Sequence, residues 1–287
     1  MSNMSRTVIL GANGFIGGTI ARCLKKARIP IVPMSREQID FTDESAPSTI
    51  AKLLQPEDAV VITAAKAPCK NNAMLLDNIL MMERIGHALQ QQPVSHVIYI
   101  SSDAVYADSM RPLTESSPTA PSSLHGVMHL AREWMLASII DANKLLFLRP
   151  TLVYGKADPH NGYGPNQFYR LASRGESIQL FGEGEEQRDH VCVEDVAEIT
   201  QRCLQQRLHG TLNVVTGQTL SFAEIAAAIN PFVDTPVKIN YLPRKGPMPH
   251  NGYRAFDITR CQHLFPDFKY RTFNEGMALM RGAFAHA

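Results

Sequence analysis

The residues best suited to chemistry near the start of the chain are three glycines in the segment 11–17, GANGFIG. They follow a β-branched run, 7–10, and precede a stretch with helical spacing, 16–27. Glycines let the backbone turn tightly and approach a pyrophosphate, which then lies against the exposed N–H groups of the helix start. This context predicts a dinucleotide site rather than a plain glycine turn. We expect cofactor contacts from Gly11, Asn13, Gly14, Phe15, Ile16 and Gly17.

The elements that must position this loop are short apolar runs separated by helical stretches. Further strands are expected at 29–32, 59–62, 97–100 and 145–148, and long helices at 74–91 and 125–142. Continuous apolar strands alternating with helices predict a doubly wound α/β fold, with a parallel sheet covered on both faces. The composition changes after Pro150, where residues 155–190 are rich in Gly, Asn and Asp. We therefore expect an NAD(P)-binding Rossmann domain at 1–155 and a smaller substrate-binding α/β lobe at 156–287, with one segment returning to the sheet.

Composition excludes several other classes of protein. The 287 residues include 28 Lys plus Arg and 27 Asp plus Glu, a net charge of +1, which gives no reason to expect nucleic acid or an anionic membrane as a partner. No apolar run approaches the ~20 residues that span a bilayer, and the polar segment 1–7 does not resemble a signal peptide. The five cysteines are scattered and form no CxxC, so neither disulfides nor a structural metal site is expected, and the setting is cytoplasmic.

Several motifs together resemble the extended short-chain dehydrogenase/reductases, the NAD-dependent epimerase/dehydratase family. The GxxGxxG spacing is one, and AAK at 64–66, SSDAVY at 101–106 and RPTLVYG at 149–155 follow in the family's order. LFGEG at 180–184 and RDHVCVEDV at 188–196 are similar to the nucleotide-sugar members. The resemblance implies further cofactor contacts from Ala64, Ala65, Lys66, Asn78, Pro150 and Val153, and a catalytic Ser102.

The end of the second strand bears on the choice of cofactor. An acidic residue there would accept the adenosine ribose hydroxyls and favour NAD, whereas an arginine can pair with the 2′-phosphate of NADP. Here Ser35-Arg36 follows Met34, and the stretch 35–41 resembles GDP-fucose synthase and dTDP-4-dehydrorhamnose reductase. NADP is therefore expected, with NAD possible, and Ser35, Arg36 and Asp40 as contacts. The alternative is that Arg36 is a solvated surface charge.

The catalytic pair of the resembled family is replaced in this chain. That family uses Tyr-x-x-x-Lys on one helix face, where the lysine cation lowers the pKa of the tyrosine and holds the ribose. In the matching stretch 121–133, His125 stands in the tyrosine position and His129 in the lysine position. Three interpretations are open: His125 is the general acid, with Ser102 polarising the carbonyl and His129 holding the ribose; proton transfer is lost; or the two histidines bind a metal. The first is preferred, so no metal is expected.

The reaction is narrowed by the residue that follows the serine. Asp103 stands where dehydratases of the family carry an acid, but their companion glutamate is Ala104 here, and the residues that GDP-fucose synthase uses for epimerisation are missing. We therefore expect an enzyme, an NAD(P)-dependent ketoreductase, that acts on a nucleotide-linked keto-sugar and uses Ser102, Asp103, His125 and His129. The alternatives are a nucleotide-sugar 4-epimerase and a catalytically silent dinucleotide-binding protein with a regulatory or structural role.

Substrate contacts and a dimer are also implied by the resemblance. Arg188 lies in the segment that reaches a nucleotide-sugar pyrophosphate, and Asn166 and Gln167 offer amides for hydroxyl groups. A solvated surface charge is the alternative for Arg188. The helices at 74–91 and 125–142 correspond to the dimer interface of much of the family, which implies a homodimer. The residues proposed for that surface, or alternatively for the core, are Met74, Leu75, Ile79, Met81 and Met82; Trp134 is expected in core or interface.

Overall fold

The computed structural model describes residues 6–281, so the expectation about residues 1–5 of the N-terminal segment lies outside the described residues. The chain divides into two compact units, each with its own core. The first unit contains the chain up to Ala107, Ser117–Pro150 and Val196–Val214. The second contains Asp108–Ser116, Thr151–Asp195 and the chain from Val215.

The first unit is built on a six-stranded sheet in which every neighbouring pair of strands is parallel. The strand order is β2-β1-β3-β4-β5-β9, and β1, β3 and β4 are buried along their whole length. This confirms the predicted doubly wound α/β fold. The strands are β1 (Thr7–Leu10), β2 (Ile31–Met34), β3 (Ala59–Ile62), β4 (His96–Ile100), β5 (Leu145–Pro150) and β9 (Gly210–Val214).

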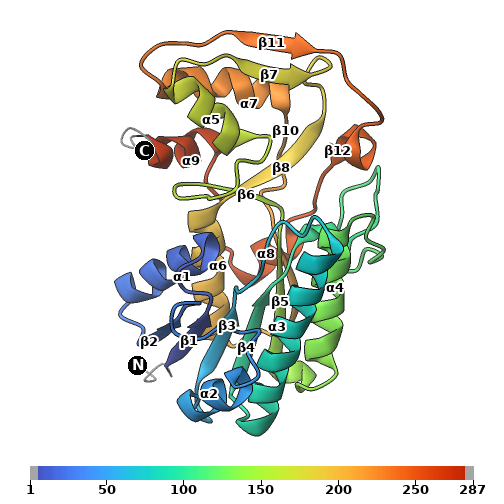
Figure 1. Cartoon of the computed structure of the whole chain (residues 1–287). Coiled ribbons are helices and arrows are strands. Elements are labelled where there is room, and N and C mark those ends of the chain that lie inside the picture. The colour runs from blue at the N-terminus through green and yellow to red at the C-terminus, as the bar shows by residue number, and fades with distance from the viewer. Residues whose placement is uncertain (1–5, 282–287) are drawn as a thin grey trace. The chain divides into compact units, whose positions relative to one another are not determined.

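Helices cover both faces of this sheet (Figure 1). On one face α2, α3 and α4 pack side by side, and their apolar residues share a core with those of β1 and β3. On the other face lie α1 and α6, which are joined where the Cys23 thiol donates to Gln201 Oε1 at 3.2 Å. The helices are α1 (Phe15–Lys26), α2 (Ala46–Leu53), α3 (Asn72–Gln91), α4 (Leu124–Ala137) and α6 (Val193–Gln206).

Three local expectations are corrected by the structure. The second strand begins at Ile31 rather than residue 29, because Arg28 adopts φ +59° and the Ile29 N–H bonds the carbonyl of Leu24, which ends α1. The helix expected to reach residue 142 ends at Ala137, where the Ser138 hydroxyl donates to the Met135 carbonyl and two β-branched isoleucines follow. Met81 and Met82 are core residues, so they form no dimer surface.

The second unit is smaller and mixed in its strand pairing. Strand β8 pairs along its length with β6, β10 and β12, and β7 pairs with β11. Aromatic side chains dominate its core, including Tyr154, Phe168 and Phe222. Its strands are β6 (Leu152–Tyr154), β7 (Ile178–Phe181), β8 (Gln187–Cys192), β10 (Thr219–Ser221), β11 (Ile239–Leu242) and β12 (Tyr253–Arg254). Its helices are α5 (Pro165–Ser173), α7 (Phe222–Ile229), α8 (Thr259–Leu264) and α9 (Phe273–Met280).

Short 3₁₀ turns complete both units. They are η1 (Asp103–Val105), η2 (Ala142–Lys144), η3 (Asn230–Phe232) and η4 (Pro249–Gly252). Among residues 6–281, no helix has the length and apolar character needed to cross a membrane. Four of the five cysteine thiols are buried, and all five cysteines are unbridged.

Candidate functional site

The glycine loop joins β1 to α1 through a close backbone contact. Gly11 adopts φ +100°, a conformation that side chains disfavour. A Cβ at Gly17 would lie 2.2 Å from the Gly11 carbonyl oxygen and 2.5 Å from Thr63 Oγ1. Position 17 must therefore be glycine for α1 to lie this close to the loop. Helix α1 begins after Gly14 with no side-chain cap, and the first N–H groups of a helix have no acceptor within it. The cradle therefore fits a diphosphate.

The segment after β2 carries the residues expected at the adenosine end of the cofactor. Ser35 is buried and its N–H donates to Gln38 Oε1 at 2.9 Å. The Arg36 side chain is 75% exposed and lies 3.9 Å from the Asp40 carboxylate, so it can still turn to a ligand. Asp40 is engaged locally: hydrogen bonds from the Thr42 backbone and hydroxyl lower the pKa of its carboxyl.

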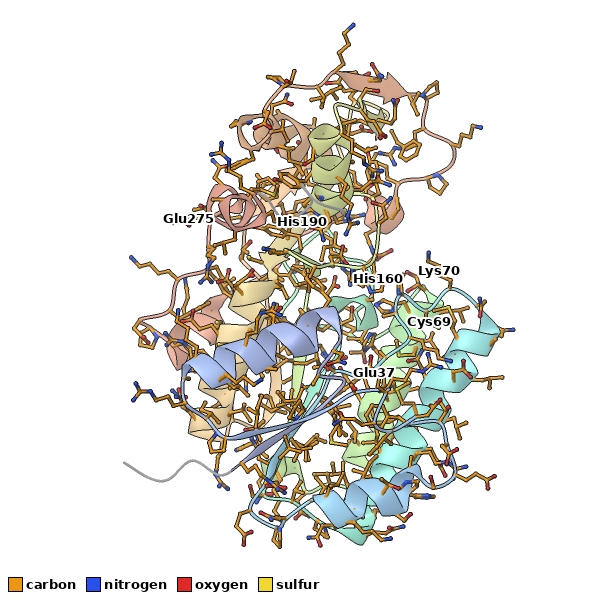
Figure 2. All side chains as sticks on the ribbon, turned by 60° about the vertical axis from the view of Figure 1, so that its left-hand side comes forward. Glu37, Cys69, Lys70, His160, His190 and Glu275 are labelled. Carbon is orange, nitrogen blue, oxygen red and sulfur yellow. The ribbon has the colours of Figure 1, made fainter. Side chains whose placement is uncertain are left out.

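A residue that the sequence analysis did not single out, Glu37, also belongs to this end of the site. The Asn13 side-chain amide donates to Glu37 Oε2 at 3.5 Å, which joins the glycine loop to the segment after β2 (Figure 2). An acidic residue of the kind that accepts ribose hydroxyls is thus present after β2, but it follows Arg36 instead of replacing it. Asn13 and Glu37 are 24 positions apart, so the sequence does not reveal their contact. The only sequence signal for Glu37 is that it directly follows Arg36.

The turn at 64–66 is held by Asn78 on α3. The Asn78 side chain is fully buried and bonds both backbone groups of Lys66: its Oδ1 accepts the Lys66 N–H at 2.9 Å, and its Nδ2 donates to the Lys66 carbonyl at 3.0 Å. The Lys66 ammonium pairs with Asp77 at 2.5 Å. Asn78 therefore shapes the turn that carries Ala64 and Ala65.

The turn that follows Ser102 and the helix that carries both histidines meet at Gly126. A Cβ at Gly126 would lie 2.1 Å from the Ala104 carbonyl oxygen, so α4 packs directly on the η1 turn. Ser102 caps that turn, because its Oγ accepts the Ala104 N–H at 3.1 Å and donates to Asp103 Oδ1 at 3.4 Å. Asp103 itself is buried. The structure thus packs the start of α4, where His125 precedes Gly126, against the turn that Ser102 caps.

His125 occupies the first turn of α4, which Ser123 caps. Its ring is partly buried, and its Nδ1 accepts the backbone N–H of Cys69, on the loop between β3 and α3, at 3.4 Å (Figure 2). With Nδ1 as an acceptor, the ring proton of a neutral imidazole lies on Nε2. His125 can therefore donate a hydrogen bond from Nε2 to a neighbouring oxygen.

A buried ion pair fixes α4 against the sheet. Glu133 accepts two hydrogen bonds from Arg149 of β5, at 2.9 and 2.6 Å, and one from the Ser101 hydroxyl at 2.6 Å. The Arg149 guanidinium lies over the ring of Tyr106, 4.8 Å from its centroid. Ser101 directly precedes Ser102, so this network sets where the end of β4 stands relative to His125.

His129 is buried, with 5% of its surface exposed, and its Nδ1 lies 2.6 Å from the Tyr99 hydroxyl of β4. Burial holds the pKa of its imidazole well below the usual range, and His125 and Arg132 lower it further. Arg132, one turn on, is fully buried and donates to the Ala64 carbonyl at 2.7 Å. The lysine position thus carries an uncharged ring, and the cation lies deeper in the unit.

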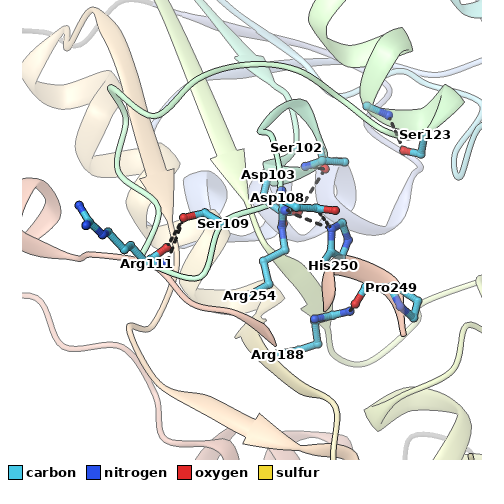
Figure 3. A network of polar contacts seen from close by, with 12 residues as sticks. Ser102, Asp103, Asp108, Ser109, Arg111, Ser123, Arg188, Pro249, His250 and Arg254 are labelled. Carbon is cyan, nitrogen blue, oxygen red and sulfur yellow. Dashed lines mark hydrogen bonds and ion pairs between the residues drawn. The ribbon is translucent and has the colours of Figure 1, made fainter. Parts of the chain in front are cut away.

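In the second unit the predicted substrate residues already have internal partners. Arg188 is buried and donates to Glu186 Oε1 at 2.5 Å and to the Pro249 carbonyl at 2.6 Å (Figure 3). A neighbouring cluster joins Asp108 to His250 at 2.5 Å and to Arg254 at 3.4 Å. The positive charges of Arg188 and Arg254 are therefore each paired with a neighbouring carboxylate.

The amide pair at the start of α5 differs in accessibility. Asn166 is buried, its Nδ2 donates to Asp158 and its Oδ1 accepts the Gly155 N–H at 3.2 Å, so its amide shapes the loop. Gln167 is partly exposed, and its Nε2 reaches the Asn161 carbonyl at 3.3 Å. Of the two remaining cofactor candidates, Pro150 ends β5 in the first unit and Val153 lies in β6 of the second.

The two histidines of α4 lie against each other, away from any larger group of metal-ligand side chains in the described residues. Within residues 6–281 no three His, Cys, Asp or Glu side chains are grouped so that they could hold a metal ion. His125 and His129 instead pack edge to face, with ring centroids 4.7 Å apart.

Comparisons with known proteins agree with this architecture. The model of the NAD dependent epimerase/dehydratase family matches residues 7–215. The structure of the UDP-glucose 4-epimerase of Thermus thermophilus, complexed with NAD, is 23% identical with a TM-score of 0.82, over 98% of this chain and 99% of that one. A GDP-6-OMe-4-keto-L-xylo-heptose reductase from C. jejuni is 18% identical with a TM-score of 0.79, over 98% and 97% of the two chains.

Proposed function

The chain belongs to the NAD-dependent epimerase/dehydratase family, and from that membership we propose that it is an NAD(P)-dependent ketoreductase that acts on a nucleotide-linked keto-sugar, with His125 as the general acid. Ser102 polarises the substrate carbonyl, and Asp103 lies beside it. Bound nicotinamide supplies the hydride. The protein's own part is to orient the carbonyl and to deliver the proton.

The observation that carries this proposal is the contact of Gly126 with η1. Because a Cβ at residue 126 would overlap the Ala104 carbonyl, His125 stands next to the segment that carries Ser102. The Cys69 N–H occupies Nδ1 of His125, which leaves the Nε2 proton for a developing alkoxide. A hydroxyl donor and an imidazole acid are the two groups that carbonyl reduction requires.

The cofactor is held by the glycine cradle and by the segment after β2. We propose NADP as the preferred form, since Arg36 is exposed and its distant pairing with Asp40 leaves it able to meet a 2′-phosphate. NAD is the second candidate, because the Glu37 carboxylate beside Asn13 is suited to accept hydrogen bonds from ribose hydroxyls. Substrate contacts are assigned to Arg188, Asn166 and Gln167, of which Gln167 is the most accessible.

A homodimer through α3 and α4 is part of the proposal. These helices pack together in the first unit and carry four exposed apolar side chains: Leu76, Leu80, Val127 and Trp134. Trp134 is 70% exposed, which is unusual for a tryptophan on a monomeric surface. Sedimentation of the wild type and of Trp134→Glu tests it, since a monomer in both cases refutes this interface.

The test of the function is turnover of NADPH with nucleotide-linked keto-sugars, compared between wild type and His125→Phe. We expect His125→Phe to abolish turnover while calorimetry shows nearly unchanged cofactor affinity. Equal turnover by the variant refutes the acid role. Conversion of a nucleotide-sugar without net NADPH consumption would identify the 4-epimerase, and cofactor binding with neither reaction would identify a silent binding protein.

A further inference from the structure

The environment of His129 determines where its ring proton lies. The Tyr99 hydroxyl is 2.6 Å from Nδ1 of His129, and the Tyr99 side chain is 1% exposed. Burial raises the pKa of Tyr99 well above its ordinary value, so the phenol keeps its proton at neutral pH. Within the part of the chain that the structure describes, Nδ1 of His129 is the acceptor placed to receive that proton. Tyr99 therefore donates and His129 accepts.

A neutral imidazole has a single ring proton, so an accepting Nδ1 places the proton on Nε2, on the side of the ring away from Tyr99. In the opposite tautomer Nδ1–H would donate to the Tyr99 oxygen, and the buried phenol proton would lose this acceptor. Packing keeps the ring in place, because it stacks at a tilt on Tyr99 with centroids 5.8 Å apart and meets His125 edge to face.

A second proton on His129 is opposed by Arg132. This guanidinium is fully buried, lies 5.1 Å from the centroid of the Tyr99 ring and donates to the carbonyl of Ala64. A buried positive charge cannot be screened by water, so it disfavours a second cation nearby. The charge that a lysine would bring to position 129 is thus present in this chain, but it is carried by Arg132 against the Tyr99 ring.

We propose that Tyr99 and Arg132 are positioning residues that hold His129 as an uncharged Nε2–H tautomer, so that the proton exchanged by the histidine pair resides on His125 alone. This proposal depends on the proposed function at one point only, which is that His125 delivers a proton. Its consequence is that His129 acts as a neutral hydrogen-bond donor, and the pair behaves as one acid instead of two coupled ones.

Among residues 6–281, the charged and titratable groups that contact His129 or shift its pKa lie on two elements. His125 and Arg132 face it from α4, and Tyr99 faces it from β4. Glu133 acts on Tyr99, but its charge is taken up by the bidentate contact with Arg149. Arg132, and His125 when it is protonated, both oppose protonation of His129.

The experiment is ¹⁵N spectroscopy of histidine-labelled, ligand-free protein between pH 8 and 5, with the His129 signals identified by their loss in His129→Gln. We expect the Nε2–H tautomer throughout and no titration of His129 in this range. An Nδ1–H tautomer, or an imidazolium forming within the range, overturns the proposal. The spectra are recorded without cofactor, so the result does not depend on enzymatic activity.

Two variants separate the roles of the positioning residues. Tyr99→Phe removes only the hydroxyl and should yield a mixture of His129 tautomers, whereas Tyr106→Phe, a matched buried tyrosine that donates to Asn213, should leave the His129 signals unchanged. Arg132→Met should raise the pKa of His129 above that of the wild type in a titration extended below pH 5, although burial still holds it low, and Arg132→Lys should restore the wild-type behaviour. Unchanged tautomer in Tyr99→Phe refutes the role of Tyr99. Expected spectra in a protein that neither binds cofactor nor turns over would refute the proposed function and leave this inference intact.

Discussion

A Cβ placed on Gly126 would lie 2.1 Å from the carbonyl oxygen of Ala104, and this contact determines how closely α4 approaches the turn that carries Ser102. The atom on the other side is backbone, which cannot rotate away as a side chain would. A helix interior normally disfavours glycine by about 1 kcal/mol relative to alanine, so its presence here is explained by packing.

Gly126→Ala should therefore lower both turnover and stability. Overpacking against backbone costs about 1–3 kcal/mol, and the displacement of His125 from Ser102 should reduce kcat by ~10²-fold. Urea unfolding and NADPH turnover measure the two effects. Gly86→Ala is the matched control, because its Cβ would meet only the flexible end of Ile139, at 3.0 Å. Equal behaviour of the two variants would contradict the role of the contact.

The choice between NADP and NAD is tested by the two adjacent charges after β2. Arg36→Ala should weaken NADPH binding about 10-fold or more and NADH binding far less, because a charged hydrogen bond to the 2′-phosphate is lost. Glu37→Gln should improve NADPH binding, since a like charge near that phosphate is removed. Calorimetric titration of both cofactors into each variant gives the four ratios. Equal losses of both cofactors in Arg36→Ala would remove Arg36 from the phosphate site.

The buried Glu133–Arg149 pair should be costly to break from one side. Glu133→Gln leaves the Arg149 guanidinium buried without its counter-charge, which should cost about 3–5 kcal/mol in the free energy of unfolding. The double variant Glu133→Gln with Arg149→Met should lose less than the sum of the single variants. The partly exposed pair Glu198–Arg202 is the control, and Glu198→Gln should cost less than about 0.5 kcal/mol. Denaturant unfolding that gives similar costs for both pairs would refute the argument.

Acid sensitivity should come in part from buried neutral histidines. Burial lowers the pKa of His190 in the second unit to about 3, and it also lowers the pKa of His129 and His96. Such a group binds a proton more readily in the unfolded chain, where its pKa is ordinary at about 6.5. The stability that His190 contributes is therefore complete above pH 6.5 and is lost as the pH falls from 6.5 toward 3, by about 1.4 kcal/mol per pH unit, and His129 and His96 act in the same direction.

His190→Leu should remove one of these contributions. The free energy of unfolding of the variant should fall by ~2 kcal/mol less than that of the wild type between about pH 6.5 and 5. His263, an exposed histidine of α8 in the same unit as His190, is the control, and the stability curve of His263→Leu should run parallel to that of the wild type. Parallel stability curves for wild type and His190→Leu would contradict the burial argument.

The elements that the sequence predicts best are those whose signal is local. The strands at 7–10 and 59–62 agree residue for residue with β1 and β3, because both are buried on two faces and so are apolar at nearly every position. The glycine segment stands between β1 and α1, where conformation and close approach require glycine whatever lies elsewhere. The helix expected to reach residue 142 was wrong at its end, because a serine that bonds its own backbone stops it earlier.

What only the tertiary structure decides are the properties that depend on distant partners. His129 is an ordinary histidine in the sequence, and its neutrality and tautomer come from Tyr99, thirty residues earlier on another element. Glu37 gains its place at the cofactor end from Asn13, and Glu133 gains its role from Arg149. Residue types and spacing predicted the family and the sheet, and they carry the hypothesis that His125 and His129 replace the family's catalytic pair. Burial and cross-element hydrogen bonds decided which of those side chains are charged, because both effects depend on neighbours that are distant in the sequence.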